Sequence, residues 1–232
     1  MEHRDQLREK MIKKCRDGQK FAKQAIYALH RNDFARSANL IKDCEDCINN
    51  ELLPLAEEDP PLRSGSFSNV VEEYAEAKLF YAWLLGKQCE GENGNNGAGF
   101  TTTADAAKGT LLLPRDFTIS MEPEEYLGGL CDLTGEIGRF AVKCGTERDE
   151  DGLRLCLETN TLILLSIQTK LLHIPNRVNK KMDQLKRSVQ KIERMTYEMS
   201  LSRAAGMNMS TEMPKEEDTT GDGGGGGSGG IE

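Results

Sequence analysis

Two pairs of acidic residues are the side chains best suited to chemistry in this sequence. Glu73 and Glu76 are three residues apart and Asp132 and Glu136 are four apart, so each pair shares one face if its segment is helical. The first pair continues a face that leads to Phe80, and like charges beside apolar surface are unfavourable unless a cation neutralises them. Carboxylate oxygens without histidine favour Mg²⁺, or Mn²⁺, over zinc. If the two helices pack side by side, the four carboxylates would converge on such an ion.

A plainer interpretation of these acids stays open at this point. Either pair could face solvent, and Glu136 could form an ordinary surface ion pair with Arg139. Gly128, Gly129 and Gly135 lie in the same segment, and each costs up to about 1 kcal/mol relative to alanine inside a helix. They would be tolerated where another helix or a ligand approaches closely.

The elements that must position these acids are predicted to be helices. Apolar residues recur at three-to-four spacing along most of the chain, and no convincing strand pair is found. We expect helices at 4–30, 34–52 (capped by Asn32 or Asp33, ending before Pro54), from Ser68 or Asn69 to Cys89, 123–144, from Asp149 or Asp151 until Pro175, and 176–202. A loop is predicted from Pro54 to Ser68. The fold class is therefore all-α, a bundle of six or seven helices.

The last helix carries a regular apolar seam. Its members recur at alternating four and three spacing: Val178, Met182, Leu185, Val189, Ile192 and Met199. Such a seam favours core packing within a bundle, with subunit contact as the alternative.

Two segments are predicted to lie outside the helical core. A Gly/Asn-rich stretch at 90–109 is a plausible mobile loop, and residues 204–232 form a Gly-rich acidic tail predicted to be disordered. The folded domain is therefore expected at 1–203.

Charge is distributed unevenly along the 232 residues. Residues 1–42 hold 11 Lys/Arg against 5 Asp/Glu, residues 170–203 hold 9 against 3, and the formal net charge is nevertheless −8. The basic segments are solvated helix faces in the plainer interpretation, or phosphate contacts in the sharper one. No stretch is apolar enough to span a membrane, and the charged N-terminus does not resemble a signal peptide.

The seven cysteines are typical of reduced thiols, which predicts a location in the cytosol or nucleus. Cys44 and Cys47 form a lone C-x-x-C without a second pair or a nearby histidine, so we expect buried thiols there and no zinc site.

Four segments resemble the translin family: FAKQAIYALHRND, EEYAEA, EEYLGGLCDLTGEIGRFAV and KKMDQLKRSVQKIERMTYEMSL. The third is similar to the branch of translin-associated factor X (TRAX). The resemblance implies a helical bundle that assembles with translin-like subunits, or with itself, into a closed oligomer, typically an octamer. It implies an Mg²⁺-dependent endonuclease of single-stranded RNA, with single-stranded DNA as a further candidate ligand, that acts on small RNA or tRNA fragments in the cytoplasm and nucleus.

The resemblance also assigns roles to residues. The family's catalytic acids match Glu73, Glu76, Asp132 and Glu136, and Glu76 and Glu136 are the metal ligands with most support. The rival function is a non-catalytic nucleic-acid-binding or scaffold subunit.

Other polar and aromatic residues receive weaker interpretations. Arg139 and Lys143 are candidate RNA contacts, although pairing within the helix is favoured. Tyr74 is expected to pack, with base stacking as the alternative. The three histidines have no evident acid-base partner and are expected at surface or packing positions: His3, His30 and His173.

Overall fold

The computed structural model describes residues 2–92, 111–204 and 206, with the backbone alone for 87–92. Within these residues the chain is helical and contains no strand, which confirms the all-α prediction. The main helices are α1 (Glu2–His30), α2 (Phe34–Cys47), α3 (Leu53–Glu58), α4 (Ser66–Glu92), α6 (Pro123–Glu147), α7 (Glu150–Lys170) and α8 (Asn176–Ala204). None of the described helices is long and apolar enough to cross a bilayer.

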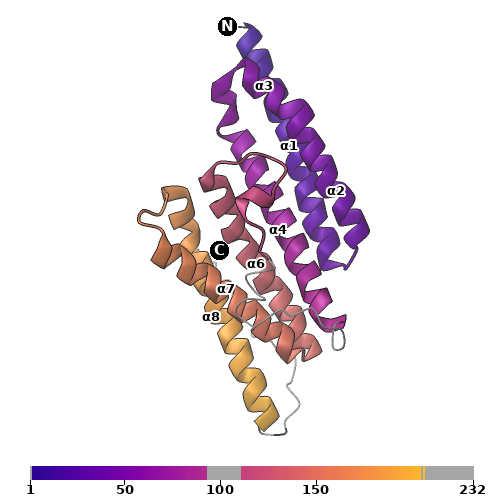
Figure 1. The fold of residues 1–232 in the computed structure, drawn as a ribbon, viewed down its shortest axis with the longest axis vertical. Coiled ribbons are helices and arrows are strands. Elements are labelled where there is room, and N and C mark those ends of the chain that lie inside the picture. The colour runs from indigo at the N-terminus through magenta and orange to yellow at the C-terminus, as the bar shows by residue number, and fades with distance from the viewer. Residues whose placement is uncertain (1, 93–110, 205, 207–232) are drawn as a thin grey trace, which may run out of the picture.

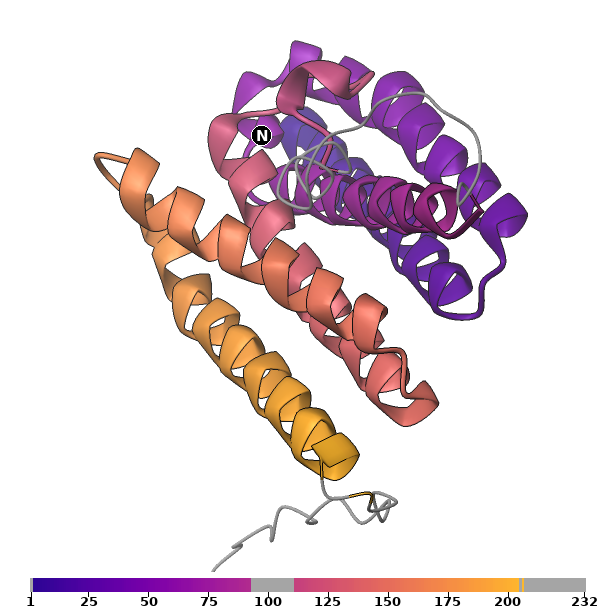
Figure 2. The same cartoon turned by 60° about the horizontal axis from the view of Figure 1, so that its bottom comes forward.

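Four long helices form a row in the order α1, α4, α6, α8 (Figures 1 and 2). They run in the same direction, as contacts along α1 and α4 show: Gly18 faces Val70 near one end, and the rings of His30 and Phe80 lie 5.0 Å apart further along. Helix α2 returns against α1 and α4, and α7 returns against α6 and α8. Every helix of the row therefore has a neighbour against which it buries its apolar face.

Helix starts follow the predicted capping chemistry. The Asp33 carboxylate accepts a hydrogen bond from the Arg36 backbone N–H at 3.1 Å, and Asp149 accepts one from Gly152 N–H at 2.8 Å. Pro123 occupies the first turn of α6, where its missing N–H costs little. These caps fix where α2, α6 and α7 begin.

The prediction of a loop from Pro54 to Ser68 is wrong. After α2 the chain passes through a π-helical turn, Ile48–Leu52, directly into α3, and Pro54 lies in the first turn of that helix. A 3₁₀ turn, Pro60–Arg63, follows. Proline stops a helix only where its own N–H is needed, and a first turn does not need it.

Some predicted boundaries also shift. Helix α4 begins at Ser66, so the Ser68 hydroxyl is not its cap and instead accepts a hydrogen bond from Arg177 at 3.2 Å. The same helix continues past Cys89 to Glu92. Helix α7 ends at Lys170, before Pro175. The rest of the predicted Gly/Asn-rich loop and almost all of the predicted tail lie outside the described residues.

The burial of the α8 seam confirms the prediction that it packs within the chain. All six seam residues are buried against the bundle. Beside them, the fully buried Asn160 side chain donates to the Thr134 carbonyl and to the Ser188 hydroxyl, both at 3.0 Å. This amide joins α6, α7 and α8, because a buried donor needs a partner and here it has two.

The C-x-x-C thiols are free and buried, as predicted. Cys44 Sγ donates to the Gly18 carbonyl at 3.4 Å, and Cys47 Sγ donates to the Lys14 carbonyl at 3.6 Å. Burial raises the pKa of both thiols. They are packing residues between α1 and α2.

Candidate active site

The acidic site forms where α4 and α6 approach most closely. A Cβ placed on Gly129 would lie 2.8 Å from the Glu72 carbonyl oxygen and 3.0 Å from the Glu76 amide nitrogen. A Cβ on Gly128 would overlap the Glu72 side chain. The glycines noted in the sequence therefore allow two backbones to come together, which turns the acids of one helix toward those of the other.

Glu76 lies at the centre of this cluster. Its side chain is 8% exposed, and within the described residues its carboxyl group has no hydrogen bond and no ion pair. Burial, followed by the negative charges of Asp132, Glu136 and Glu73, raises the pKa of Glu76 to about 9. The four predicted acids thus share one electrostatic neighbourhood, and Glu76 holds a proton at neutral pH.

Helix α1 and helix α8 each supply a lysine to the cluster. Lys23 Nζ of α1 lies 3.2 Å from Glu73 Oε1, and Lys181 Nζ of α8 contacts Asp132 Oδ2. Burial still raises the pKa of Glu73 and of Asp132, although the neighbouring lysine opposes the rise in each case. These lysines partly neutralise the site when no metal is bound.

Glu136 has two partners, one of which the sequence interpretation missed. His30 Nε2 lies 2.5 Å from Glu136 Oε2, and Arg139 Nη1 donates to the same oxygen at 3.1 Å. The expectation that His30 has no acid-base partner is therefore wrong, and so is the one for His3, whose Nε2 lies 2.8 Å from Glu58 Oε1. His173 is exposed, as expected.

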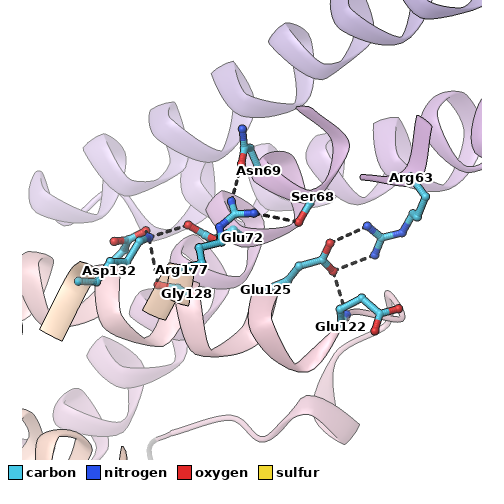
Figure 3. Close-up of polar contacts among 10 residues, drawn as sticks. Arg63, Ser68, Asn69, Glu72, Glu122, Glu125, Gly128, Asp132 and Arg177 are labelled. Atoms are coloured by element: carbon cyan, nitrogen blue, oxygen red, sulfur yellow. Dashed lines mark hydrogen bonds and ion pairs between the residues drawn. The ribbon is translucent and has the colours of Figure 1, made fainter. Parts of the chain in front are cut away.

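A fifth acid, Glu72, was also missed. It is 7% exposed and accepts a hydrogen bond from Lys181 Nζ at 2.6 Å, while Arg177 Nε lies 2.8 Å from its other oxygen (Figure 3). Because Lys181 also binds Asp132, its ammonium group joins α4, α6 and α8. Glu72 is adjacent to Glu73 in sequence but lies on the side of α4 that faces α8, and only the packed helices reveal this.

A third buried carboxyl group lies at the start of α6, before the acids of the cluster. Glu125 is 2% exposed and accepts two hydrogen bonds from the Arg63 guanidinium, at 2.6 and 2.8 Å, and one from the Glu122 backbone N–H at 2.9 Å (Figure 3). The two hydrogen bonds from the Arg63 guanidinium compensate the negative charge of Glu125. It is a structural ion pair at the start of α6.

The remaining candidate residues fall into place. Arg139 pairs within α6 and keeps its side chain 68% exposed, and Lys143 Nζ lies 5.9 Å from the Phe140 ring centre. Tyr74 is fully buried and donates its hydroxyl to Glu45 at 2.5 Å, which confirms the packing role.

The chemistry of the acids fits a hard divalent cation, but in the structure three of them form ion pairs with other side chains. Across residues 2–92 and 111–204, no group of three or more His, Cys, Asp or Glu side chains is positioned to hold a metal ion. Glu73, Asp132 and Glu136 instead point to their lysine, histidine and arginine partners. Glu76 is protonated, lies among acids and accepts no hydrogen bond from the described residues. A bound divalent cation would take the place of its proton and compensate the negative charge of the ionised carboxylate.

Comparisons with known proteins agree on one family. The model of the translin family matches residues 6–203. The chain is 28% identical over 231 residues to the translin-associated protein X homolog of Schizosaccharomyces pombe, covering 90% of each. Among solved structures, the AfC3PO–duplex RNA complex superposes with a TM-score of 0.67 at 17% identity, covering 88% of this chain and 94% of that one. Apo-NeC3PO gives 0.68 at 13% identity, with 85% and 92% covered.

Proposed function

Because this chain belongs to the translin family and is similar to a translin-associated protein X homolog over most of its length, we propose that it is the catalytic subunit of a translin–TRAX-type oligomer. Its activity would be Mg²⁺-dependent (or Mn²⁺-dependent) endonucleolytic cleavage of single-stranded RNA, in small-RNA or tRNA-fragment processing. AfC3PO, which has a similar fold, was solved in complex with duplex RNA, and this supports RNA as the ligand class. The expected location is the cytoplasm and nucleus.

The observation that carries the proposal is buried Glu76 in its acidic surroundings. A buried carboxyl group that accepts no hydrogen bond from the described part of the chain and lies among three further acids destabilises the folded state. Groups with a strongly perturbed pKa of this kind cluster at functional sites. A divalent ion held by Glu76 and Glu136, with Asp132 and Glu73 completing the set, would neutralise the cluster. Such an ion activates water and stabilises negative charge on a phosphate.

The residues around the acids have defined tasks in this proposal. Lys181 and Lys23 keep Asp132 and Glu73 in place before an ion enters, and each acid must turn from its lysine to reach the ion. Arg139, exposed beside Glu136, is the candidate to contact the RNA phosphate. Lys143, further along the same helix, is the second candidate.

One experiment tests the proposal directly. The oligomer is incubated with labelled single-stranded RNA and Mg²⁺ or EDTA, with and without a translin-like partner. Glu136→Ala should lower the Mg²⁺-dependent cleavage rate on the order of 100-fold or more, since even outer partners of metal ligands cost 10- to 100-fold. Oligomer size should not change. Glu124→Ala, at an exposed acid of the same helix, is the matched control and should cleave normally.

A non-catalytic RNA-binding or scaffold subunit is the second candidate. The observation in its favour is that lysine and arginine side chains already form ion pairs with three of the acids. Binding of RNA without cleavage in Mg²⁺, in both the wild type and Glu136→Ala, would establish this alternative and overturn the nuclease.

A further inference from the structure

The outward face of α1 carries a basic stripe, which we define as Lys13, Arg16, Lys20 and Lys23. All four are exposed, and they follow one another at spacings of three and four residues, about one helical turn of 5.4 Å each. Cations at this regular spacing along one straight helix present a linear positive surface.

Three of the four cations of the stripe are unpaired in the part of the chain that the structure describes. Asp17 is the only acidic residue from Lys13 to Arg31 in the sequence. It borders the stripe, four residues after Lys13 and three before Lys20, and its charge adds to burial in raising the pKa of Cys47. Within the described residues, Lys13, Arg16 and Lys20 form no ion pair and no side-chain hydrogen bond. Their charges are available to an external anion.

The stripe ends at the acidic site. Lys23, its last member, lies 3.2 Å from Glu73, one of the acids that raise the pKa of Glu76 together with its burial. One turn further along α1, Tyr27 is 61% exposed, and the Arg31 guanidinium lies 5.6 Å from its ring centre and donates to its hydroxyl at 3.1 Å. A held aromatic ring beside a cation is a platform on which a nucleobase can stack.

Helix α8, the other basic helix, is used differently. Its Lys181 and Arg177 are bound to Glu72. Three further cations, Lys180, Arg187 and Lys191, are exposed on the side of α8 opposite the buried seam, and we call this surface the α8 outer face. It points away from the bundle. Of the two basic helices that the structure describes, α1 is therefore the one that combines unpaired cations with a direct contact to an acid of the cluster.

We propose that the α1 stripe and Tyr27 form the track for single-stranded RNA, with the sugar-phosphate backbone along α1 and a base stacked on Tyr27. The strand would thereby place a phosphate beside Lys23 at the rim of the acidic site. This inference rests on the proposed function in that it takes RNA as the ligand.

The test measures RNA affinity of the full-length protein by fluorescence anisotropy, with labelled single-stranded poly-uridine RNA in EDTA across a salt titration. Replacing Lys13, Arg16 and Lys20 by glutamine should reduce the salt slope of log K by about 2, because each phosphate contact to a single strand contributes about 0.7. Affinity at moderate salt should fall on the order of 10-fold or more. The same three changes on the α8 outer face alter net charge equally and should leave affinity within about 3-fold.

A second pair of variants tests stacking without altering the stripe. Tyr27→Ala should weaken binding about 5- to 100-fold, in line with the loss of one base–aromatic stack. Tyr27→Phe keeps the ring and should bind like the wild type. Because Tyr27 is exposed, both variants should retain the thermal melting curve of the wild type, so the test holds even if the triple variant folds poorly.

The outcomes separate the track from the nuclease. Unchanged affinity in the α1 variants, or an equal loss in the α8 control, overturns the track. An absence of cleavage by the wild type in Mg²⁺, with the α1-specific loss of affinity present, overturns the proposed function and leaves the track standing. A preference of the stripe for duplex RNA over the single strand would also overturn it.

Discussion

Replacing Glu76 by glutamine should stabilise the metal-free protein, and the gain should grow with pH. The ordinary pKa of this carboxyl is 4.5, and burial with neighbouring acids raises it to about 9 in the folded chain. At pH 7 the folded state therefore holds a proton that the unfolded state has lost. At about 1.36 kcal/mol per pKa unit, the difference corresponds to about 3 kcal/mol that glutamine, which is always neutral, does not lose.

The sign of the pH dependence follows from the raised pKa. The contribution of Glu76 to stability is fully present below its unfolded pKa of 4.5 and is lost as pH rises toward 9. The difference in unfolding free energy between variant and wild type should therefore rise by about 1.4 kcal/mol per pH unit between about pH 5 and pH 8. Other acids titrate in both proteins, so the difference isolates this residue.

Urea denaturation in EDTA, followed by circular dichroism at fixed protein concentration, measures this difference. Glu124→Gln, at an exposed acid of α6, is the control and should show no such slope. A flat difference across the pH range, or a wild type more stable than Glu76→Gln at pH 8, would refute the buried-proton reasoning. Mg²⁺ at about 100 times its Kd should stabilise the wild type by about 2.7 kcal/mol and the variant by less.

Three further predictions follow from the packing. Gly129→Ala should destabilise the fold by about 1–3 kcal/mol in urea denaturation, because its Cβ would meet the Glu72 backbone, whereas Gly135→Ala, with room for a Cβ, should be neutral or stabilising by up to about 1 kcal/mol. Asn160→Leu should lower stability by about 1–3 kcal/mol and hydrogen-exchange protection between α6 and α8, since both hydrogen bonds donated by the buried amide are lost and only the one from the Ser188 hydroxyl to the Thr134 carbonyl remains; an unchanged melting temperature would contradict this. Cys44, a buried thiol with a raised pKa, should react with a disulfide reagent only at the rate of unfolding, and rapid reaction in native buffer would show that the α1–α2 contact opens.

The helices and the acidic pairs could be predicted because their signals are local. Spacings of three and four residues place Glu73 with Glu76, and Asp132 with Glu136, on one helix face each, whatever the rest of the chain does. The glycines of α6 indicated a close approach, and the structure has one at Gly129. The error at Pro54 has a local cause as well, because a proline suits a first turn as readily as a loop.

The partners of the acids could not be predicted, because they come from distant segments. His30 reaches Glu136 across 106 residues, and Lys181 reaches Glu72 across 109. Charged side chains of this kind are common on exposed helix faces, and only the packing of the row decides which of them turn inward. The sequence pattern therefore predicts where the acidic residues cluster but not which cationic side chains form ion pairs with them.

Lys181 follows Asp132 by 49 residues, and this separation has a consequence for biosynthesis. Until α8 emerges and docks, Glu72 and Asp132 face the α4–α6 seam without their ammonium partner, and two uncompensated carboxylates oppose closure of that seam. A nascent or prematurely terminated chain would thus carry every acid of the site and still be unable to assemble it. Closure of the acidic cluster would therefore wait until α8 has docked against α4 and α6.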